Sequence, residues 1–367
     1  MALAIIMLMA IYKVYRTRDY SVFKKFFFIF FIMMIIAETI STFAGVDPAN
    51  SIKSYESFWV LSYLPAIYVV FAGRDKINYM IYVFLGTICA SLYGIIELFY
   101  YNMSRADGFF SHSLTFGNVL ALVVIAAIGV IVFKAYETKT HLNVTLITLL
   151  ASVPALMLSG SRGPILACLI SVFVMMVFKY RWKGLIPSIV VLLVIFFTIS
   201  QIPSVKIRFV KTIGNISNTE SSIGTRLVLW EASMKAIMAR PVFGYGKRNF
   251  TSEVSKYINV PTSSRAHAHN TYIQYTFLHG FFGLSALLGF LGSVVWEIWR
   301  RRRSGPYLKI ALFVVLVFLL EGLTENALGD SEIVIMCFSL IGLMLAPGRP
   351  AISIDDDLEE FTEPLQN

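Results

Sequence analysis

The stretch FFFIFFIMMIIAETISTF at residues 26–43 sets the fold class of this chain, because a single ionisable side chain, Glu38, interrupts its apolar run. A run of this length and composition matches the thickness of a bilayer when it is helical. The whole chain is 57% hydrophobic and 14% charged, with a mean hydropathy of +0.72, which is far more apolar than a soluble domain. Comparable runs lie at residues 1–12, 58–73, 79–101, 117–133, 144–158, 164–178, 185–202, 272–296, 310–324 and 333–346. The sequence therefore predicts an all-α integral membrane protein with about 11–12 transmembrane helices.

The positive charges predict the orientation of these runs. Alternate gaps hold eighteen of the Lys and Arg residues, while the short gaps between them hold only Lys53, Arg105 and Arg162. Because short cytoplasmic loops carry an excess of Lys and Arg, the gaps rich in positive charge are predicted to be cytoplasmic. The net charge of +9 then reflects membrane orientation together with one basic loop, and no nucleic-acid partner is expected.

The chain divides into four parts by composition. Residues 1–202 hold about eight spans, residues 203–271 form a basic external loop, residues 272–346 hold three spans, and residues 347–367 form an acidic cytoplasmic tail. Within the loop, residues 224–238 read as an amphipathic helix that Pro241 ends. The apolar face predicted for that helix is Leu227, Trp230, Met234, Ile237 and Met238. Such a helix either lies flat on the membrane or forms a basic lid over an anionic, lipid-borne substrate.

Two arginines mark a predicted anion site on the external side. The spans that start near residues 117, 164 and 272 run from outside to inside, so the positive ends of their helix dipoles face outward. Arg162 lies in the tight turn before one of these starts, and Arg105 lies before another. Arginines beside helix N-termini suit a phosphate group. The alternative is that Arg162 is an interfacial anchor.

The stretch AHAHNTY at residues 266–272 supplies the candidate base. On a helix, His269 shares a face with Tyr272 and Gly280, where the glycine would let a neighbouring helix approach. A neutral imidazole can take a proton from a sugar hydroxyl, although His269 as an interfacial cap is the alternative. His267, Asn270 and Tyr272 are expected to contact substrate, with His267 off that face and less important. A His-x-His pair suggests zinc, but no other ligand is close in sequence, so no metal is expected.

Three carboxylates, Glu38, Glu97 and Glu321, lie inside predicted spans toward their external ends. Intramembrane carboxylates are costly and usually face a cavity or a partner. They could orient His269, pair with the arginines or contact acceptor hydroxyls, and the sequence leaves these roles open.

Four motifs in this order resemble the O-antigen ligase and polymerase family of bacterial membrane glycosyltransferases. They are Arg162-x-x-x-Leu166, Arg226-Leu-x-x-Trp230, Pro241-x-x-Gly-x-Gly246 and His269-x₁₀-Gly280. The resemblance covers about residues 20–346. Relatives usually have about twelve spans, so either an N-terminal helix is missing here, which is the favoured expectation, or residues 1–15 form a partial span.

The resemblance implies a fold like that of the C-type glycosyltransferases, which use lipid-linked donors. It also implies the following activity. A glycan would move from undecaprenyl diphosphate to a sugar hydroxyl of lipid A–core, at the periplasmic face of the bacterial inner membrane. The resemblance implies that Arg162 and Arg226, with Arg105, bind the leaving diphosphate and that His269 is the base. The reaction would need no cofactor or metal and would invert the anomeric centre. A polymerase that uses the same donor is the main alternative. A lipid-linked sugar transporter is less favoured, because the halves show no internal repeat.

Overall fold

The computed structural model describes residues 2–184, 186, 222–258 and 266–348. Within these residues all regular structure is helical, and the chain is an all-α integral membrane protein. The α-helices are α1 (Ala2–Thr17), α2 (Phe26–Ala44), α3 (Pro48–Ser51), α4 (Tyr63–Val70), α5 (Lys76–Tyr100), α6 (Ser113–Val132), α7 (Lys139–Leu158), α8 (Arg162–Tyr180), α11 (Ser222–Ala239), α12 (Phe250–Val254), α13 (Thr271–Arg301), α14 (Pro306–Glu321) and α15 (Ser331–Leu345). Short 3₁₀ segments occupy Ser21–Lys24, Ile52–Ser62, Arg181–Gly184, Ser255–Tyr257 and Ala327–Gly329.

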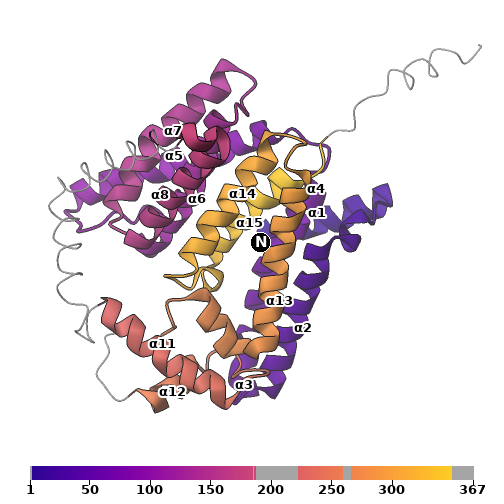
Figure 1. Cartoon of the computed structure of the whole chain (residues 1–367), viewed down its shortest axis with the longest axis vertical. Coiled ribbons are helices and arrows are strands. Elements are labelled where there is room, and N and C mark those ends of the chain that lie inside the picture. Colours follow the sequence, from indigo (N-terminus) through magenta and orange to yellow (C-terminus); the bar gives the residue numbers. More distant parts are fainter. Residues whose placement is uncertain (1, 185, 187–221, 259–265, 349–367) are drawn as a thin grey trace, which may run out of the picture.

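The helices form two groups that meet at α14 and α15 (Figure 1). In the first group α7 packs on α5 and α6, and α8 packs on α6 and α14; in the second, α13 packs along α2 while α4 contacts α1 and α15. The α11 and α12 helices lie beyond one end of the bundle, beside the start of α13 (Figure 1). We call this the loop end; α7 ends there and α8 begins there.

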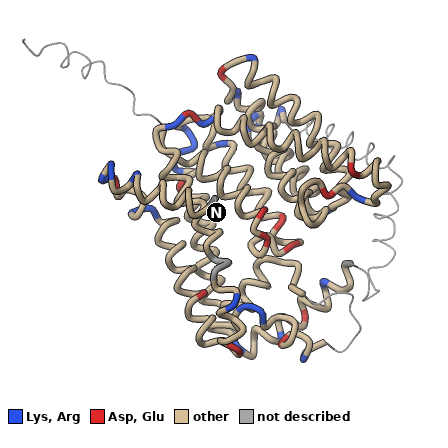
Figure 2. Tube along the Cα trace, turned by 180° about the vertical axis from the view of Figure 1, so that it is seen from behind, with Lys and Arg blue, Asp and Glu red and all other residues tan. Residues whose placement is uncertain are grey.

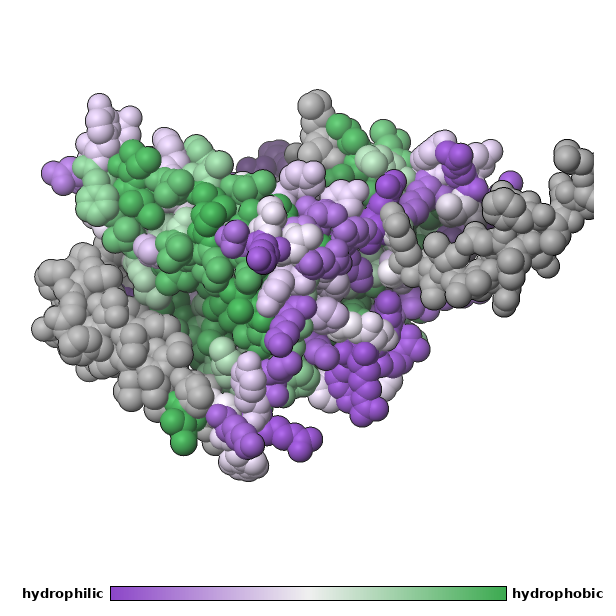
Figure 3. All heavy atoms as spheres, turned by 90° about the horizontal axis from the view of Figure 1, so that it is seen from above, coloured by the Kyte–Doolittle hydropathy of each residue, from purple (hydrophilic) through white to green (hydrophobic). Residues whose placement is uncertain are grey.

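Helix α6 is the centre of the first group because it is apolar all round and its small residues admit close neighbours. It is buried along most of its length, and a Cβ at Gly129 would meet Ile310 of α14 at 2.9 Å. Large exposed hydrophobic side chains lie instead on α1, α2, α5 and α7, as expected for helices that face lipid. Figure 3 shows a broad hydrophobic area on one face, and in Figure 2 the charges lie mainly in loops and near helix ends.

Six helices of the described chain are long and apolar enough to cross a membrane: Phe26–Ala44, Lys76–Tyr100, Ser113–Val132, Lys139–Leu158, Arg162–Gly184 and Thr271–Arg301. Three other predicted spans are helices of 15 or 16 residues, namely α1, α14 and α15. They are shorter than the roughly 20 residues that a straight span needs. The expected span at 185–202 lies almost wholly outside the described residues.

The predicted span at 58–73 is wrong as a single α-helix. The chain runs as a 3₁₀ segment up to Ser62, and the α-helix α4 starts only at Tyr63 and has 8 residues. Pro65 explains this break, because proline has no N–H to donate and is tolerated only in the first turn of an α-helix. The short helix is nevertheless buried, with Gly342 of α15 packed close to the carbonyl of Leu64.

Candidate active site at the loop end

Helix α11 belongs to a small second core at the loop end. The expected helix forms, and it ends just before Pro241. Its buried face is Leu229, Ala232, Ala236 and Ile237, which pack with Tyr245, Phe250 and Phe277. The predicted apolar face is therefore largely wrong, since Leu227, Met234 and Met238 are exposed. Both sides of α11 carry apolar residues, so the helical period alone does not identify the buried one.

Backbone hydrogen bonds from the turn 241–246 attach this small core to α13. Helix α13 is broken at Gly280, which has a φ of 66°. The backbone N–H groups of Tyr245 and Gly246 donate to the carbonyls of Phe277 and Leu278 at 3.0 and 2.9 Å. A Cβ at Gly280 would overlap the carbonyl of Val242, so only glycine fits there. The glycine thus admits a loop, and the expectation of a neighbouring helix at this position is wrong.

Two hydrogen bonds to Ala268 fix the segment that carries the two histidines. The side chain of Trp230 donates through Nε1 to the carbonyl of Ala268 at 2.8 Å, and the N–H of Ala268 donates to Gln274 Oε1 at 2.8 Å. His267 and His269 flank this clamped residue. His269 has a φ of 48° and precedes the N-cap of α13, so the expectation that it lies on a helix face with Gly280 is wrong.

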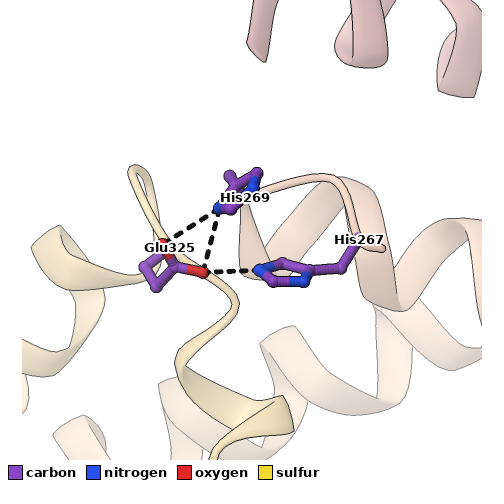
Figure 4. Close-up of side chains that lie close together, drawn as sticks. All are labelled: His267, His269 and Glu325. Carbon is purple, nitrogen blue, oxygen red and sulfur yellow. Dashed lines mark hydrogen bonds and ion pairs between the residues drawn. The ribbon is translucent and has the colours of Figure 1, made fainter. Parts of the chain in front are cut away.

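A carboxylate from a different part of the chain meets both histidines (Figure 4). Glu325 follows α14, and its loop is tied to α13 because Thr271 donates through Oγ1 to the carbonyl of Glu325 at 3.0 Å. The Oε1 atom of Glu325 lies 2.8 Å from Nε2 of His267. Nδ1 of His269 lies 3.1 and 3.2 Å from the two carboxylate oxygens. His267, expected off the face of His269, therefore meets the same carboxylate as His269.

These contacts define the hydrogen-bonding state of His269. An ionised carboxylate can only accept, so Nδ1 of His269 carries a proton toward Glu325, and in the neutral imidazole Nε2 is then the atom with the lone pair. Burial by itself raises the pKa of Glu325, but hydrogen bonds from His267 and then His269 reverse this and hold that pKa well below its usual range. The result is an imidazole oriented by a buried carboxylate, an arrangement suited to a general base.

Arg226 brings a positive charge to the same carboxylate. It lies on α11 one turn before Trp230, so one helix face carries both residues to the site. Its NH2 atom lies 3.7 Å from Oε2 of Glu325, an ion pair longer than a hydrogen bond. Burial lowers the pKa of Arg226 and Glu325 partly restores it. An arginine stays charged under these conditions, so its guanidinium can also meet an anionic ligand.

A cavity of about 460 Å³ opens beside this cluster. His267, His269 and Glu325 form part of its wall, and Asn326 and Asp330 lie on the same loop. Asn118 of α6 also lines it, is 1% exposed, and has both amide atoms without a partner among the described residues. Buried amides without partners are costly, so this wall is suited to a polar ligand.

The same three side chains have the composition of a metal site. Their ligand atoms lie within 4.8 Å of one another, and two histidines with one glutamate is a set used by catalytic zinc. The expectation that no such cluster forms on this side is therefore wrong. The sequence missed it because Glu325 stands 56 residues after His269. One nitrogen of each imidazole, Nε2 of His267 and Nδ1 of His269, is already at hydrogen-bonding distance from the carboxylate, so the three side chains also pair with one another without an ion.

The other predicted arginines lie nearby with different partners. Arg105 donates from Nε to the carbonyl of Ser159 and from NH2 to Oγ of Ser161, both at 2.7 Å. It therefore holds the turn between α7 and α8. Arg162 is the half-buried first residue of α8. A Cβ on the next residue, Gly163, would be 2.6 Å from Oγ1 of Thr324, so the start of α8 abuts the loop that carries Glu325.

Asn270 and Tyr272, both expected to contact substrate, have polar atoms engaged in the fold. The Asn270 side chain caps α13 by accepting from the N–H groups of Tyr272 and Ile273 at 2.9 and 3.0 Å. The Tyr272 hydroxyl donates to the carbonyl of Leu319 at 3.0 Å. Both residues thus position the histidine loop and the start of α13.

The three intramembrane glutamates have separate surroundings. Glu38 of α2 is paired with Lys247, which follows the 241–246 turn. Glu321 of α14 is fully buried, and within the described residues neither of its oxygens has a partner. Glu97 lies near the end of α5, with one buried oxygen unpartnered among the described residues. The described part of the chain records no bond between any of these glutamates and His269.

Glu325 is a candidate site residue that the sequence-based predictions did not include. The candidate carboxylates lay inside the predicted spans, and Glu325 falls one residue beyond the span at 310–324. A signal was present, since the short gap at 325–332, predicted to be external, holds three carboxylates, Glu325, Asp330 and Glu332. An acidic residue in this gap can pair with histidines predicted to lie on the same side of the membrane.

Two comparisons with known proteins bear on this site. A family model described as O-Antigen ligase matches residues 146–288. The matched region begins within α7 and ends within α13, so it includes Arg162, Arg226, His267 and His269 but stops before Glu325. No curated protein matches the chain.

Proposed function

Because the chain belongs to the O-antigen ligase family by its match over residues 146–288, we propose that it transfers a glycan from undecaprenyl diphosphate to a sugar hydroxyl of lipid A–core. The observation that carries this proposal is the pairing of Glu325 with Nδ1 of His269, at 3.1 and 3.2 Å, beside the cavity at the loop end. The reaction takes place at the periplasmic face of the bacterial inner membrane, and the loop end faces the periplasm.

His269 acts as the general base. Its Nε2 takes the proton of the acceptor hydroxyl as the hydroxyl oxygen attacks the anomeric carbon of the donor. The bond between that carbon and the diphosphate oxygen breaks, and its electron pair leaves on undecaprenyl diphosphate. Glu325 stabilises the imidazolium that forms, and a single in-line displacement inverts the anomeric centre.

Arg226 and Arg162 hold the leaving diphosphate. Bidentate guanidinium–phosphate contacts neutralise the charge that grows on the leaving oxygen, which is the main electrostatic demand of this reaction. Arg105 supports them by fixing the turn that carries Arg162. In this mechanism the carboxylate–imidazole pair supplies the base, and the arginines balance the phosphate charge, so no metal ion is required.

Deletion of the gene in its own host tests this function. If the protein is a ligase, its loss leaves the finished glycan on its lipid carrier, and lipid A–core without glycan accumulates. If it is a polymerase, the second candidate function, its loss leaves single repeat units on core. Donor trapped on the cytoplasmic side would instead refute both and indicate transport.

A further inference from the structure

A second cavity of about 240 Å³, lined by both polar and apolar side chains, lies next to the first at the loop end. The two cavities share the wall formed by Asn326, Gly329 and Ser331. Resting on the proposed function, we infer that this second cavity is a subsite for one sugar ring of the acceptor glycan, held by Tyr275, Lys247 and Glu38.

The cavity has the size and the depth for a single ring. A volume of about 240 Å³ is far larger than the roughly 10–15 Å³ that one water molecule needs, so the cavity admits a group much larger than water. Tyr275 lies four residues after the start of α13 and Glu38 six residues before the end of α2. At about 1.5 Å per residue, both side chains are anchored within about 10 Å of the loop end, at a depth that a headgroup sugar can reach.

Tyr275 provides the independent sign of a missing ligand. Its side chain lines the cavity and the residue is 7% exposed, yet its hydroxyl has no partner among the described residues. A buried hydroxyl without a partner is destabilising, so a fold that keeps one has a reason to do so. A ligand hydroxyl in the cavity would satisfy it.

The charges of the cavity wall favour a neutral ligand. Glu38 and Lys247 form an ion pair, with 3% and 18% of their side chains exposed, and the two charges offset each other. An anion such as diphosphate would meet the Glu38 carboxylate. A sugar instead offers hydroxyl groups that both donate and accept, and apolar C–H faces for Val60, Leu61 and Leu278, which also line the cavity.

Gln274 links this subsite to the proposed base. It lines the second cavity, and its Oε1 accepts from the N–H of Ala268, the residue between His267 and His269. Gln274 is therefore the single residue between a ring bound in the second cavity and the loop that carries the histidines. Binding in the second cavity would hold an acceptor hydroxyl toward the first, where the donor reacts.

The test is binding of lipid-free sugars to the full chain in nanodiscs. The two probes are deacylated core oligosaccharide and the free oligosaccharide of the donor repeat unit, which represent the acceptors of a ligase and of a polymerase. Tyr275→Phe removes only the hydroxyl, and loss of one hydrogen bond should weaken the Kd of one probe by roughly 3- to 10-fold. Tyr307→Phe is the matched control, because it removes a hydroxyl bonded to the Ala135 carbonyl at 3.1 Å, outside the subsite.

Equal Kd values for wild type and Tyr275→Phe, or no binding of either probe to wild type, would overturn the subsite. The probe whose affinity depends on Tyr275 identifies the source of the acceptor sugar. Lys247→Met should weaken the binding of the same probe. A thermal melt checks that each variant is folded. In a separate transfer assay, Tyr275→Phe should raise KM for acceptor and leave KM for donor unchanged. Tyr275-dependent binding without any transfer by wild type would refute the proposed function and leave the subsite standing.

Discussion

Replacing Glu325 with glutamine removes one charge from the site and almost nothing else. The amide keeps the shape of the side chain, and its oxygen can still accept from one ring and from the N–H of Asn326, which donates at 3.0 Å. What is lost is the interaction between the carboxylate and the imidazolium that forms when His269 takes a proton. Arg226 remains, so donor binding is expected to persist.

The size of this loss follows from the distance. Unit charges separated by 3.1 Å interact by roughly 5 kcal/mol at an effective dielectric constant of about 20. At about 1.4 kcal/mol per tenfold change, this sets a ceiling of roughly 10³- to 10⁴-fold on the rate. We expect kcat of Glu325→Gln to fall at least about 100-fold, since the glutamine dipole recovers part of the interaction.

The pKa of Glu325 predicts how its contribution depends on pH. Because the folded pKa of Glu325 is lowered, its contribution is fully present above the ordinary value of 4.5 and is lost only as pH falls through the folded value. Between about pH 5 and 8 the carboxylate therefore stays ionised, so the ratio of wild-type to Glu325→Gln rates should stay large across this range.

The assay is single-turnover transfer from a defined undecaprenyl-diphosphate glycan, measured across this pH range. Glu297→Gln is the matched control, because Glu297 also accepts from several cations, Lys25 and Arg300 among them, but lies at the opposite end of the bundle. A Glu325→Gln enzyme within about threefold of wild type across this pH range would refute the role of the carboxylate.

Three further outcomes are expected. Arg226→Ala and Arg162→Ala should each abolish transfer and raise KM for donor, with Lys restoring only part because an ammonium cannot bind phosphate bidentately; two fully active variants would make both arginines structural. Gly280→Ala should destabilise the chain by about 2 kcal/mol or more in thermal unfolding, because alanine is strained at this φ and overlaps Val242. Gly292→Ala on the same helix has open space around it and should not destabilise the chain. Equal melting temperatures for the two variants would contradict the break in α13 at Gly280. Cysteine in place of exposed Ser252 should react with an impermeant thiol reagent from the periplasmic side, and cysteine in place of exposed Ser304 only after lysis; the reverse pattern would overturn the orientation.

The sequence predicted the fold class because hydrophobic runs have a direct physical cause in the bilayer. It failed where local context decides. The apolar run at 58–73 contains Pro65, whose missing N–H matters more for the helix than the hydropathy of the segment. In α11 the exposed residues are as apolar as the buried ones, so periodicity selected the wrong face.

The candidate site was half visible in the sequence. Motif spacing indicated His269 and Arg226, and the structure places both against one carboxylate. That carboxylate, Glu325, comes from the loop after α14, and a contact between such distant segments has no local signature. The glycine motif was recognised for the wrong reason, since Gly280 makes room for the 241–246 turn only once α13 is broken.

The central claim is that His269, held by Glu325, removes the acceptor proton without the help of a metal ion. Single-turnover transfer by purified wild type and His269→Ala, each with and without EDTA, tests it most directly, with donor binding measured in parallel. We expect wild type to transfer at the same rate with and without chelator, and His269→Ala to bind donor and transfer nothing. A wild type that loses activity in EDTA and regains it with Zn²⁺ would show that His267, His269 and Glu325 hold a catalytic ion, and would contradict the account.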